Sequence, residues 1–267
     1  MARKGRNGAV KSPGRSTRRP VVHSDPAWEA MKAARRNLRP ADAVRECAFL
    51  SEQYRSIKSM AEINLKSIIL ALQAKKVPFV LTGAHAIATW TGRPRATADV
   101  DILVKSGRNH ARAVKAIQAT YPELEMRNFA GMAAFFVPGE TQSVIDVTYP
   151  HREDIRQSLE TAIWIEDQGL EFRVPRLEAA LANKYGASLA PMRDAGKRGQ
   201  DMVDFFNMVR HSLDEGRERI DMKWLAELGE MVWPGGGGKE LVELVQKAKA
   251  GEVPRVDVRK KNVGRKS

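Results

Sequence analysis

Hydrophobic residues recur at helical spacing near the N-terminus and then gather into short runs in the middle of the chain. Over residues 42–76 the apolar positions recur mostly at steps of three or four, which predicts a helical stretch. Pro78 prevents this stretch from continuing. The short apolar runs that follow, bounded by Gly and Pro, are typical of buried strands. These strands are predicted at 78–82, 98–104, 132–137 and 143–148.

Helical patterns lie between these strands and dominate after Pro150. Two are predicted at 84–91 and 109–120, and two short strands at 163–165 and 171–174. Four more helices are predicted at 176–189, 201–211, 222–231 and 239–250. The order of elements indicates an α+β fold, with a small mixed sheet flanked by helices and a helical C-terminal part.

The domain organisation follows from the same pattern and from the distribution of charge. We expect a disordered basic tail at 1–40, an N-terminal helix at 41–76, a core at 77–175, a helical region at 176–250 and a second basic tail at 251–267. The net charge of +13 lies in the tails, because residues 41–250 carry 28 basic and 28 acidic side chains. Such tails can bind nucleic acid by neutralising phosphates, or can be solvated and disordered.

Cysteine content and hydropathy restrict the class of protein further. Cys47 is the single cysteine, which excludes an intrachain disulfide and a multi-cysteine zinc site. No apolar run approaches the roughly 18 residues of a membrane helix, and the charged N-terminus lacks the apolar segment of a secretory signal. We therefore expect a cytoplasmic protein without membrane contact.

Three aspartates in strand-like segments are the candidate chemistry. Asp99 and Asp101 are two residues apart, so on a strand their carboxylates share one face. Asp146 lies between Ile145 and Val147, where an unpartnered carboxylate would be costly to bury. If the strand at 143–148 pairs beside that at 98–104, the three carboxylates form a cluster suited to Mg²⁺ and to two-metal chemistry.

A glycine turn precedes this acidic pair. The strand ending at Gly83 and the helix opening at Ala84 would expose backbone N–H groups of the kind that bind phosphates. Arg93 and Arg95 follow at the far end of that helix, where either could meet a phosphate or the acidic cluster. Each feature taken alone can also be explained without a functional site, since an Asp-x-Asp arises by chance about once in a chain of this length. The glycine turn, the arginine and the three aspartates in this order are much rarer by chance.

The run LTGAHAIATWTGRPRATADVDILV, residues 81–104, resembles the signature of the polymerase-β-like nucleotidyltransferases, most closely their AbiEii-type toxin and minimal branches. The resemblance covers residues 77–212 and implies a nucleotidyltransferase fold. It implies metal-binding and catalytic roles for Asp99, Asp101 and Asp146. It also implies nucleotide-binding roles for positions of the first motif, namely Gly83, Ala84, Arg95 and Thr97.

A second segment, RLEAALANKYGASLAPMRDAGKRGQDMVDFF, is similar to a later motif of the same family. Lys184 matches its helix lysine and is the fourth expected catalytic residue, and Arg193 matches its arginine. Asp201 and Asp204 match its acidic pair. They are also explained as dipole partners at a helix N-terminus or as ion-pair partners of Arg193 or Lys197, and we expect a structural role for Asp204.

Three positions depart from the family pattern. Ala84 stands where a glycine or serine is usual, His85 where smaller residues are common, and Gln200 where lysine is frequent. These departures leave open a degenerate, inactive member of the family.

The sequence thus favours a Mg²⁺-dependent, toxin-type enzyme that moves a nucleoside monophosphate from an NTP to an acceptor hydroxyl. The resemblance implies RNA or tRNA as the acceptor and an antitoxin as a partner. A small molecule and a protein hydroxyl remain alternative acceptors. A degenerate module that binds nucleotide or RNA without chemistry is an alternative function, and a DNA-associated protein acting only through its tails is another.

Overall fold

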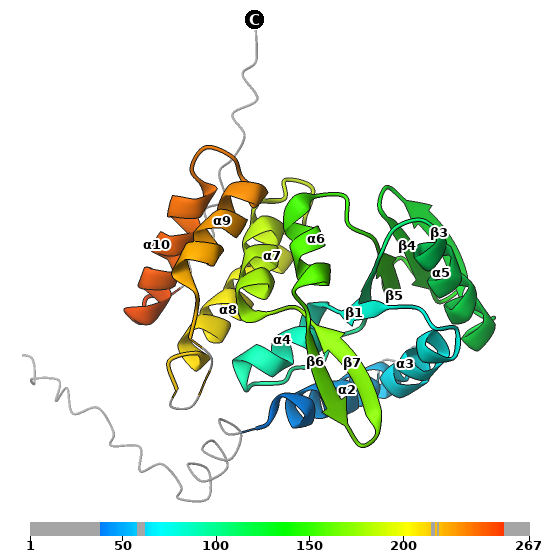
Figure 1. The fold of residues 1–267 in the computed structure, drawn as a ribbon. Coiled ribbons are helices and arrows are strands. Elements are labelled where there is room, and N and C mark those ends of the chain that lie inside the picture. Colours follow the sequence, from blue (N-terminus) through cyan, green and yellow to red (C-terminus); the bar gives the residue numbers. More distant parts are fainter. Residues whose placement is uncertain (1–37, 58–61, 215–216, 218, 254–267) are drawn as a thin grey trace, which may run out of the picture.

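The computed structural model describes residues 38–57, 62–214, 217 and 219–253 (Figure 1). Most of the two predicted basic tails, and with them the predicted disorder, lies outside these described residues. The first tail was predicted to reach residue 40, but helix α2 (Pro40–Ile57) already begins at Pro40. Among the described residues, no helix is both long and apolar enough to cross a bilayer.

The predicted N-terminal helix is two helices. Residues 62–64 are not helical, and α3 (Leu65–Ala74) begins after them. Asn64 caps α3, since its side-chain oxygen accepts a hydrogen bond from the backbone N–H of Ser67 at 3.0 Å. The continuous helix predicted over 42–76 was therefore wrong, because a capping asparagine within the apolar pattern starts a new helix there.

The sheet is five-stranded and mixed, with the order β1-β2-β5-β4-β3. Its central pair, β2 and β5, is parallel, and every other pair is antiparallel. The condition set for a three-carboxylate cluster, that the segments around 98–104 and 143–148 pair side by side, is therefore met. The strands are β1 (Phe79–Leu81), β2 (Val100–Val104), β3 (Glu125–Phe129), β4 (Met132–Phe136) and β5 (Ser143–Thr148).

The two faces of the sheet have different environments. One face carries Val100, Ile102, Ile145 and Val147, which join the main hydrophobic core with residues of α3 and α5 (Arg108–Thr120). Figure 1 shows α3 and α5 together on that side of the sheet. The opposite face carries polar side chains of β2 and β5, and it faces a cleft rather than a packed core.

Two elements were not predicted, namely β3 and helix α6 (Glu153–Glu160). Strand β3, with the sequence EMRNF, is an edge strand whose side chains are mostly exposed, so it lacks an apolar alternation. Helix α6 has only eight residues and a largely charged sequence. Pairing with β4 and packing against the neighbouring helix α7 (Leu177–Leu189) define these elements, and neither contact is visible in a local pattern.

The C-terminal part is a helical layer with its own hydrophobic cluster. A hairpin of β6 (Ile163–Asp167) and β7 (Leu170–Val174) leads into it. Ile87 and Trp90, both from the helix after β1, join this cluster and so link the layer to the sheet. The helices of the layer are α7, α8 (Ala195–His211), α9 (Met222–Val232) and α10 (Gly237–Lys249), on the left of Figure 1.

Helix α8 begins six residues earlier than predicted. Asp194 caps it, with its side chain accepting hydrogen bonds from the backbone N–H groups of Gly196 and Lys197 at 2.8 and 3.2 Å. Asp201 and Asp204 therefore lie inside the helix, and their explanation as dipole partners at its N-terminus was wrong.

Candidate active site

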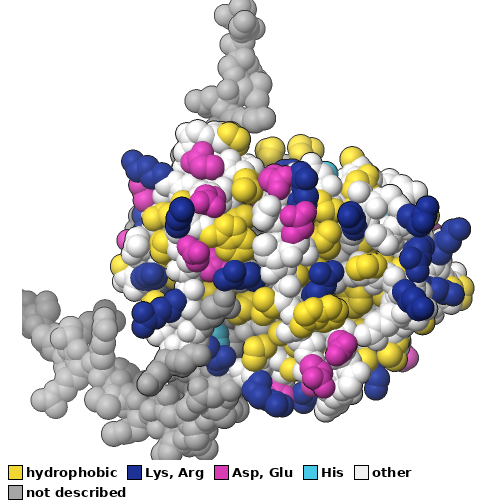
Figure 2. Space-filling view, viewed as in Figure 1, with side chains coloured by type: hydrophobic (Ala, Val, Ile, Leu, Met, Phe, Trp, Pro, Cys, Tyr) yellow, Lys and Arg dark blue, Asp and Glu magenta, His cyan; other side chains and the backbone are white. Residues whose placement is uncertain are grey.

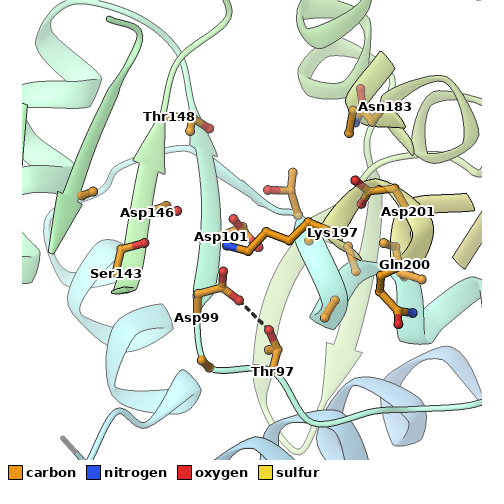
Figure 3. Close-up of a pocket in the computed structure, with 18 of the residues that line it drawn as sticks. Thr97, Asp99, Asp101, Ser143, Asp146, Thr148, Asn183, Lys197, Gln200 and Asp201 are labelled. Atoms are coloured by element: carbon orange, nitrogen blue, oxygen red, sulfur yellow. Dashed lines mark hydrogen bonds between the residues drawn. The ribbon is translucent and has the colours of Figure 1, made fainter. Parts of the chain in front are cut away.

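Three carboxylates meet on the cleft face of the sheet (Figure 3). Asp101 of β2 is paired in register with Asp146 of β5, which puts the two side chains side by side. Asp99 lies one residue before β2, outside the observed strand bounds. One oxygen of each of the three carboxylates lies within 4.8 Å of the others. We call Asp99, Asp101 and Asp146 the acidic triad.

The acidic triad is electrostatically strained without a cation. Burial raises the pKa of Asp101 well above its ordinary value, and the charges of Asp99 and Asp146 raise it further. Burial is also the main cause that raises the pKa of Asp146 to about 6. The Oδ1 atom of Asp146 is buried without a hydrogen-bond partner. These carboxylate oxygens are hard ligands and fit a divalent cation. Mg²⁺ is the commonest such cation near phosphates.

The turn at Gly83 brings a helix N-terminus against the triad. Helix α4 (Gly83–Thr91) begins directly after β1, and the Thr82 N–H donates to the carbonyl of Asp101 at 2.9 Å. Gly83 has φ +61°, and a Cβ atom there would lie 1.7 Å from Oδ2 of Asp101. Because no side chain caps α4, its first N–H groups are available to an anion beside the triad.

The loop before β2 is fixed by residues of α2. Thr97 donates its hydroxyl hydrogen bond to Oδ1 of Asp99 at 2.5 Å, so this predicted nucleotide-binding side chain orients a triad member. The Thr97 N–H donates to Oγ of Ser51 at 3.0 Å. Arg55, which is 1% exposed, donates weakly to the carbonyls of Thr97 and Ala98 at 3.4 Å. Sequence reasoning missed Ser51 and Arg55, since both belong to an ordinary amphipathic helix.

Lys184 and Arg95 belong to a charge network around two buried aspartates, Asp201 and Asp204, on the opposite wall of the cleft. Lys184 pairs with both Asp201 and Asp204, each at 2.8 Å. Arg193 pairs with Asp201 at 2.6 Å, and Arg95 pairs with Asp204 at 3.1 Å. Burial alone would raise the pKa of Asp204, but the charges of Lys184 and Arg95 hold this pKa below its ordinary value. Asp204 thus has the structural contacts that were expected, and Lys184 is a largely buried member of the network.

Gln200 and His85 occupy two of the positions that depart from the family pattern. The Gln200 amide donates to Oδ1 of Asp204 at 2.9 Å and so extends the charge network. His85 on α4 is completely buried, and neither ring nitrogen has a hydrogen-bond partner. Burial lowers its pKa to about 4. Ala84 is buried beside Ala43 and Cys47 of α2, so the helix N-terminus is backed by small side chains.

Sequence reasoning also missed Lys197 as a site residue. It lies in the first turn of α8, lines the cleft, and extends across it toward the acidic triad in Figure 3. Its charge lowers the pKa of Asp146, which opposes the effect of burial. The cap formed by Asp194 is the sequence signal that could have placed the start of α8 and hence this lysine.

The cleft itself has a volume of about 920 Å³. The sheet supplies the acidic triad on one wall, α4 supplies its N-terminus, and α7 and α8 supply the charge network on the other wall. A cleft of this size accommodates a nucleotide, since small-molecule sites typically measure some 300–1,000 Å³. The arrangement can therefore hold a metal-bound phosphate ester between an acidic wall and a basic wall.

The solved structures that match this chain are remote from it in sequence. One is an antigenic nucleotidyltransferase-like protein from Paracoccidioides brasiliensis, with 18% identity, a TM-score of 0.42, and coverage of 67% of this chain and 91% of that one. Another is JHP933 from Helicobacter pylori, with 14% identity, a TM-score of 0.40, and coverage of 70% and 89%. We take no residue role from either protein. No curated protein matches the chain.

A family model, described as "Nucleotidyl transferase AbiEii toxin, Type IV TA system", matches residues 67–257. This match includes the turn at Gly83, the acidic triad and the charge-network residues of α7 and α8. It ends beyond α10, so it also includes the helical layer. With its α+β fold and five-stranded mixed sheet, the chain belongs to the AbiEii nucleotidyltransferase toxin family.

Proposed function

We propose that this protein transfers a nucleoside monophosphate from a Mg²⁺-bound NTP to the hydroxyl group of an acceptor, with release of pyrophosphate. The observation that carries the proposal is the meeting of three carboxylates within 4.8 Å beside the uncapped N-terminus of α4. The three carboxylates are suited to a divalent cation, and the N–H groups at the start of α4 are suited to phosphate oxygens. A nucleoside triphosphate with its metal ion requires both.

The acidic triad would hold the metal. Asp99 and Asp101 would bind it through carboxylate oxygens, and the hydrogen bond from Thr97 would keep Asp99 in the necessary orientation. When bound, Mg²⁺ supplies Lewis-acid stabilisation of the charge on the phosphate oxygens. Its binding would also relieve the repulsion that raises the pKa of Asp101.

The first turn of α4 would bind the triphosphate. Gly83 has no side chain, so a phosphate can approach the backbone N–H groups of residues 83 and 84 next to Asp101. An alanine at position 84 is compatible with this role, because the donors belong to the backbone. The missing serine hydroxyl would remove one hydrogen bond but not the site.

Asp146 would activate the acceptor. Its Oδ1 atom has no hydrogen-bond partner, so it can accept the proton of the acceptor hydroxyl. The acceptor oxygen would form a bond to the α-phosphorus while its proton passes to Asp146. The bond from the α-phosphorus to the oxygen that bridges it to the β-phosphorus would break, and pyrophosphate would leave with that electron pair.

Lys184 and Arg95 would act from the charge network. Lys184 is held by two aspartates, yet its charge and that of Arg193 lower the pKa of Asp101, so both cations influence the triad. We assign Lys184 the role of stabilising negative charge on the triphosphate through this field. Arg95, which pairs with Asp204, would fix the loop that leads to Thr97.

RNA, with tRNA as the leading candidate, is the acceptor we propose. Basic side chains gather on the side of the molecule where α5 lies (Figure 2). Helix α5 supplies Arg108, Arg112 and Lys115 and contains no acidic residue. Such a surface attracts a polyanion, and because α5 packs on the sheet face opposite the cleft, it would contact parts of an RNA that extend beyond the site. A family named for toxins of toxin–antitoxin systems also leads us to propose an antitoxin as a partner.

The test is incubation of the protein with labelled NTPs and total cellular RNA, with and without Mg²⁺. Wild-type protein should label RNA and release pyrophosphate only with Mg²⁺. Asp99→Asn and Asp101→Asn should reduce the rate at least about 10³-fold, while Glu140→Gln, an exposed control outside the cleft, should not. Nucleotide binding without pyrophosphate release would identify a non-catalytic module instead. Labelling of a small molecule or a protein would exclude RNA as the acceptor.

A further inference from the structure

Among the described residues, four basic side chains line the cleft, and three of them are already paired. Arg95, Lys184 and Arg193 each form an ion pair with Asp201 or Asp204. Lys197 differs, because no carboxylate in the described part of the chain forms an ion pair or a hydrogen bond with its ammonium group. Its side chain is the cationic group of the cleft that can bind a new anion without first leaving a partner.

Lys197 is directed at the triad from the opposite wall. Figure 3 shows its side chain extended from α8 across the cleft, with the ammonium group on the side of Asp99 and Asp101. Its charge also acts on the carboxyl group of Asp146. An anion bound between the N-terminus of α4 and the triad would therefore have this ammonium group facing it.

The position of Lys197 in its helix does not favour the stability of the folded protein. It is the third residue of α8, where the helix dipole favours an acidic side chain over a basic one. Asp194 already satisfies the N–H groups of this turn, so the lysine side chain makes no capping contact. A bound polyphosphate would turn this arrangement into a favourable one, since the ammonium group would then have an anionic partner.

We propose that Lys197 binds the β- and γ-phosphates of the NTP and stabilises the departing pyrophosphate. This inference rests on the function proposed above and adds a residue to it. The ammonium group of Lys197 would donate hydrogen bonds to the phosphate oxygens, while the electron pair of the broken P–O bond moves to pyrophosphate. Its charge matters most in the transition state, where the leaving group gains negative charge.

The role differs from that of Lys184. Lys184 bridges Asp201 and Asp204 at 2.8 Å each, and its side chain is 11% exposed. Moving it onto a phosphate would leave two buried carboxylates with fewer partners, which is unfavourable. Lys197 is exposed and carries no such constraint. The two lysines thus have separate roles, with Lys184 acting through its field and Lys197 through direct contact.

The experiment compares Lys197→Met and Lys197→Arg with Lys223→Met. Lys223 is a matched control, because it is exposed, lies in the first turn of α9 after the capping residue Asp221, and is outside the cleft. Binding of an NTP with Mg²⁺ and of inorganic pyrophosphate with Mg²⁺ is measured by calorimetry on the full chain. Lys197→Met should weaken both at least about tenfold. Lys197→Arg and Lys223→Met should stay within about threefold of wild type.

Steady-state kinetics add an independent readout. Lys197→Met should raise the KM for the NTP and lower kcat, and leave the KM for the acceptor unchanged. Unchanged binding of NTP and pyrophosphate, or an effect confined to the acceptor KM, would overturn the role of Lys197. Failure of the wild-type protein to bind any NTP would instead overturn the proposed function, so the two failures are distinguishable.

Discussion

A Cβ atom on Gly83 would lie 1.7 Å from Oδ2 of Asp101, so the first residue of α4 and a triad carboxylate are in direct contact across the turn. No L-residue with a side chain fits this position without moving Asp101. The contact explains why the glycine of the turn and the aspartate of β2 depend on one another.

Gly83→Ala should therefore abolish activity. The substitution also carries a backbone cost of roughly 1–2 kcal/mol, because φ is +61°. Gly139→Ala is a matched control, since Gly139 has φ +83° and a Cβ atom there would meet nothing within 4 Å. Both variants should lose this backbone contribution to the free energy of unfolding in urea denaturation, and Gly83→Ala should lose more because its Cβ atom clashes with Asp101. Only Gly83→Ala should lose Mg²⁺-dependent transfer, and retained activity in that variant would contradict the contact.

Asp101→Asn should stabilise the metal-free protein. Burial and two neighbouring carboxylates disfavour the charge at this position, so its removal should raise the free energy of unfolding. Mg²⁺ should raise the Tm of wild-type protein and have little effect on the variant. Glu140→Gln serves as the control for loss of one charge. A variant less stable than wild type in EDTA would contradict the account of the strained triad.

Asp201→Ala should be much more damaging to stability than Lys184→Met. Asp201 is almost fully buried and holds both Lys184 and Arg193, so its removal leaves cations undercompensated and should cost about 3–5 kcal/mol. After Lys184→Met, Asp201 keeps Arg193 and Asp204 keeps Arg95, and we expect a loss of about 1–2 kcal/mol. Guanidinium unfolding curves compare the two, and equal losses would mean that Asp201 is not the centre of the network.

His85 should make the fold sensitive to acid. Its pKa is about 4 in the folded protein against an ordinary value of 6.5, so the unfolded chain binds the proton more tightly. This contribution to stability is present above pH 6.5 and is lost as pH falls toward 4. Between about pH 7.5 and about pH 5 the loss should amount to roughly 2 kcal/mol.

The difference in unfolding free energy between wild type and His85→Leu, measured at each pH, isolates this effect from the titration of Asp146. As the pH falls, the unfolding free energy of wild type should decrease relative to that of His85→Leu. A difference that stays constant with pH would show that His85 has the same pKa in the folded and unfolded states, contrary to its burial.

The acidic triad was predictable because its signal is local. Asp146 interrupts an apolar strand, and the alternation of Asp99 and Asp101 with apolar residues marks a second one. The four main strand segments follow from the same pattern. Strand β3 could not be found in this way, because an exposed edge strand is defined by its pairing with β4 and not by burial.

The basic wall of the cleft was harder to predict. The segment AGKRGQ, residues 195–200, contains two glycines and no apolar stripe, so it reads as a loop, although it forms the first turns of α8. Placing the helix start at Asp201 hid the position of Lys197. It also left Asp201 and Asp204 with several equivalent explanations. Their partners Arg95, Lys184 and Arg193 come from three segments, and only the tertiary fold selects among them.

The parallel pairing of β2 with β5 also determines when the protein becomes competent during synthesis. Helix α5 and strands β3 and β4 lie between the paired strands in the chain, and α8 follows only after α6, β6, β7 and α7. A growing chain that has emerged only as far as β4 carries two of its three acids and lacks the facing helix. The acidic triad and the wall that faces it are therefore both present only after α8, which is late in the chain, has been made.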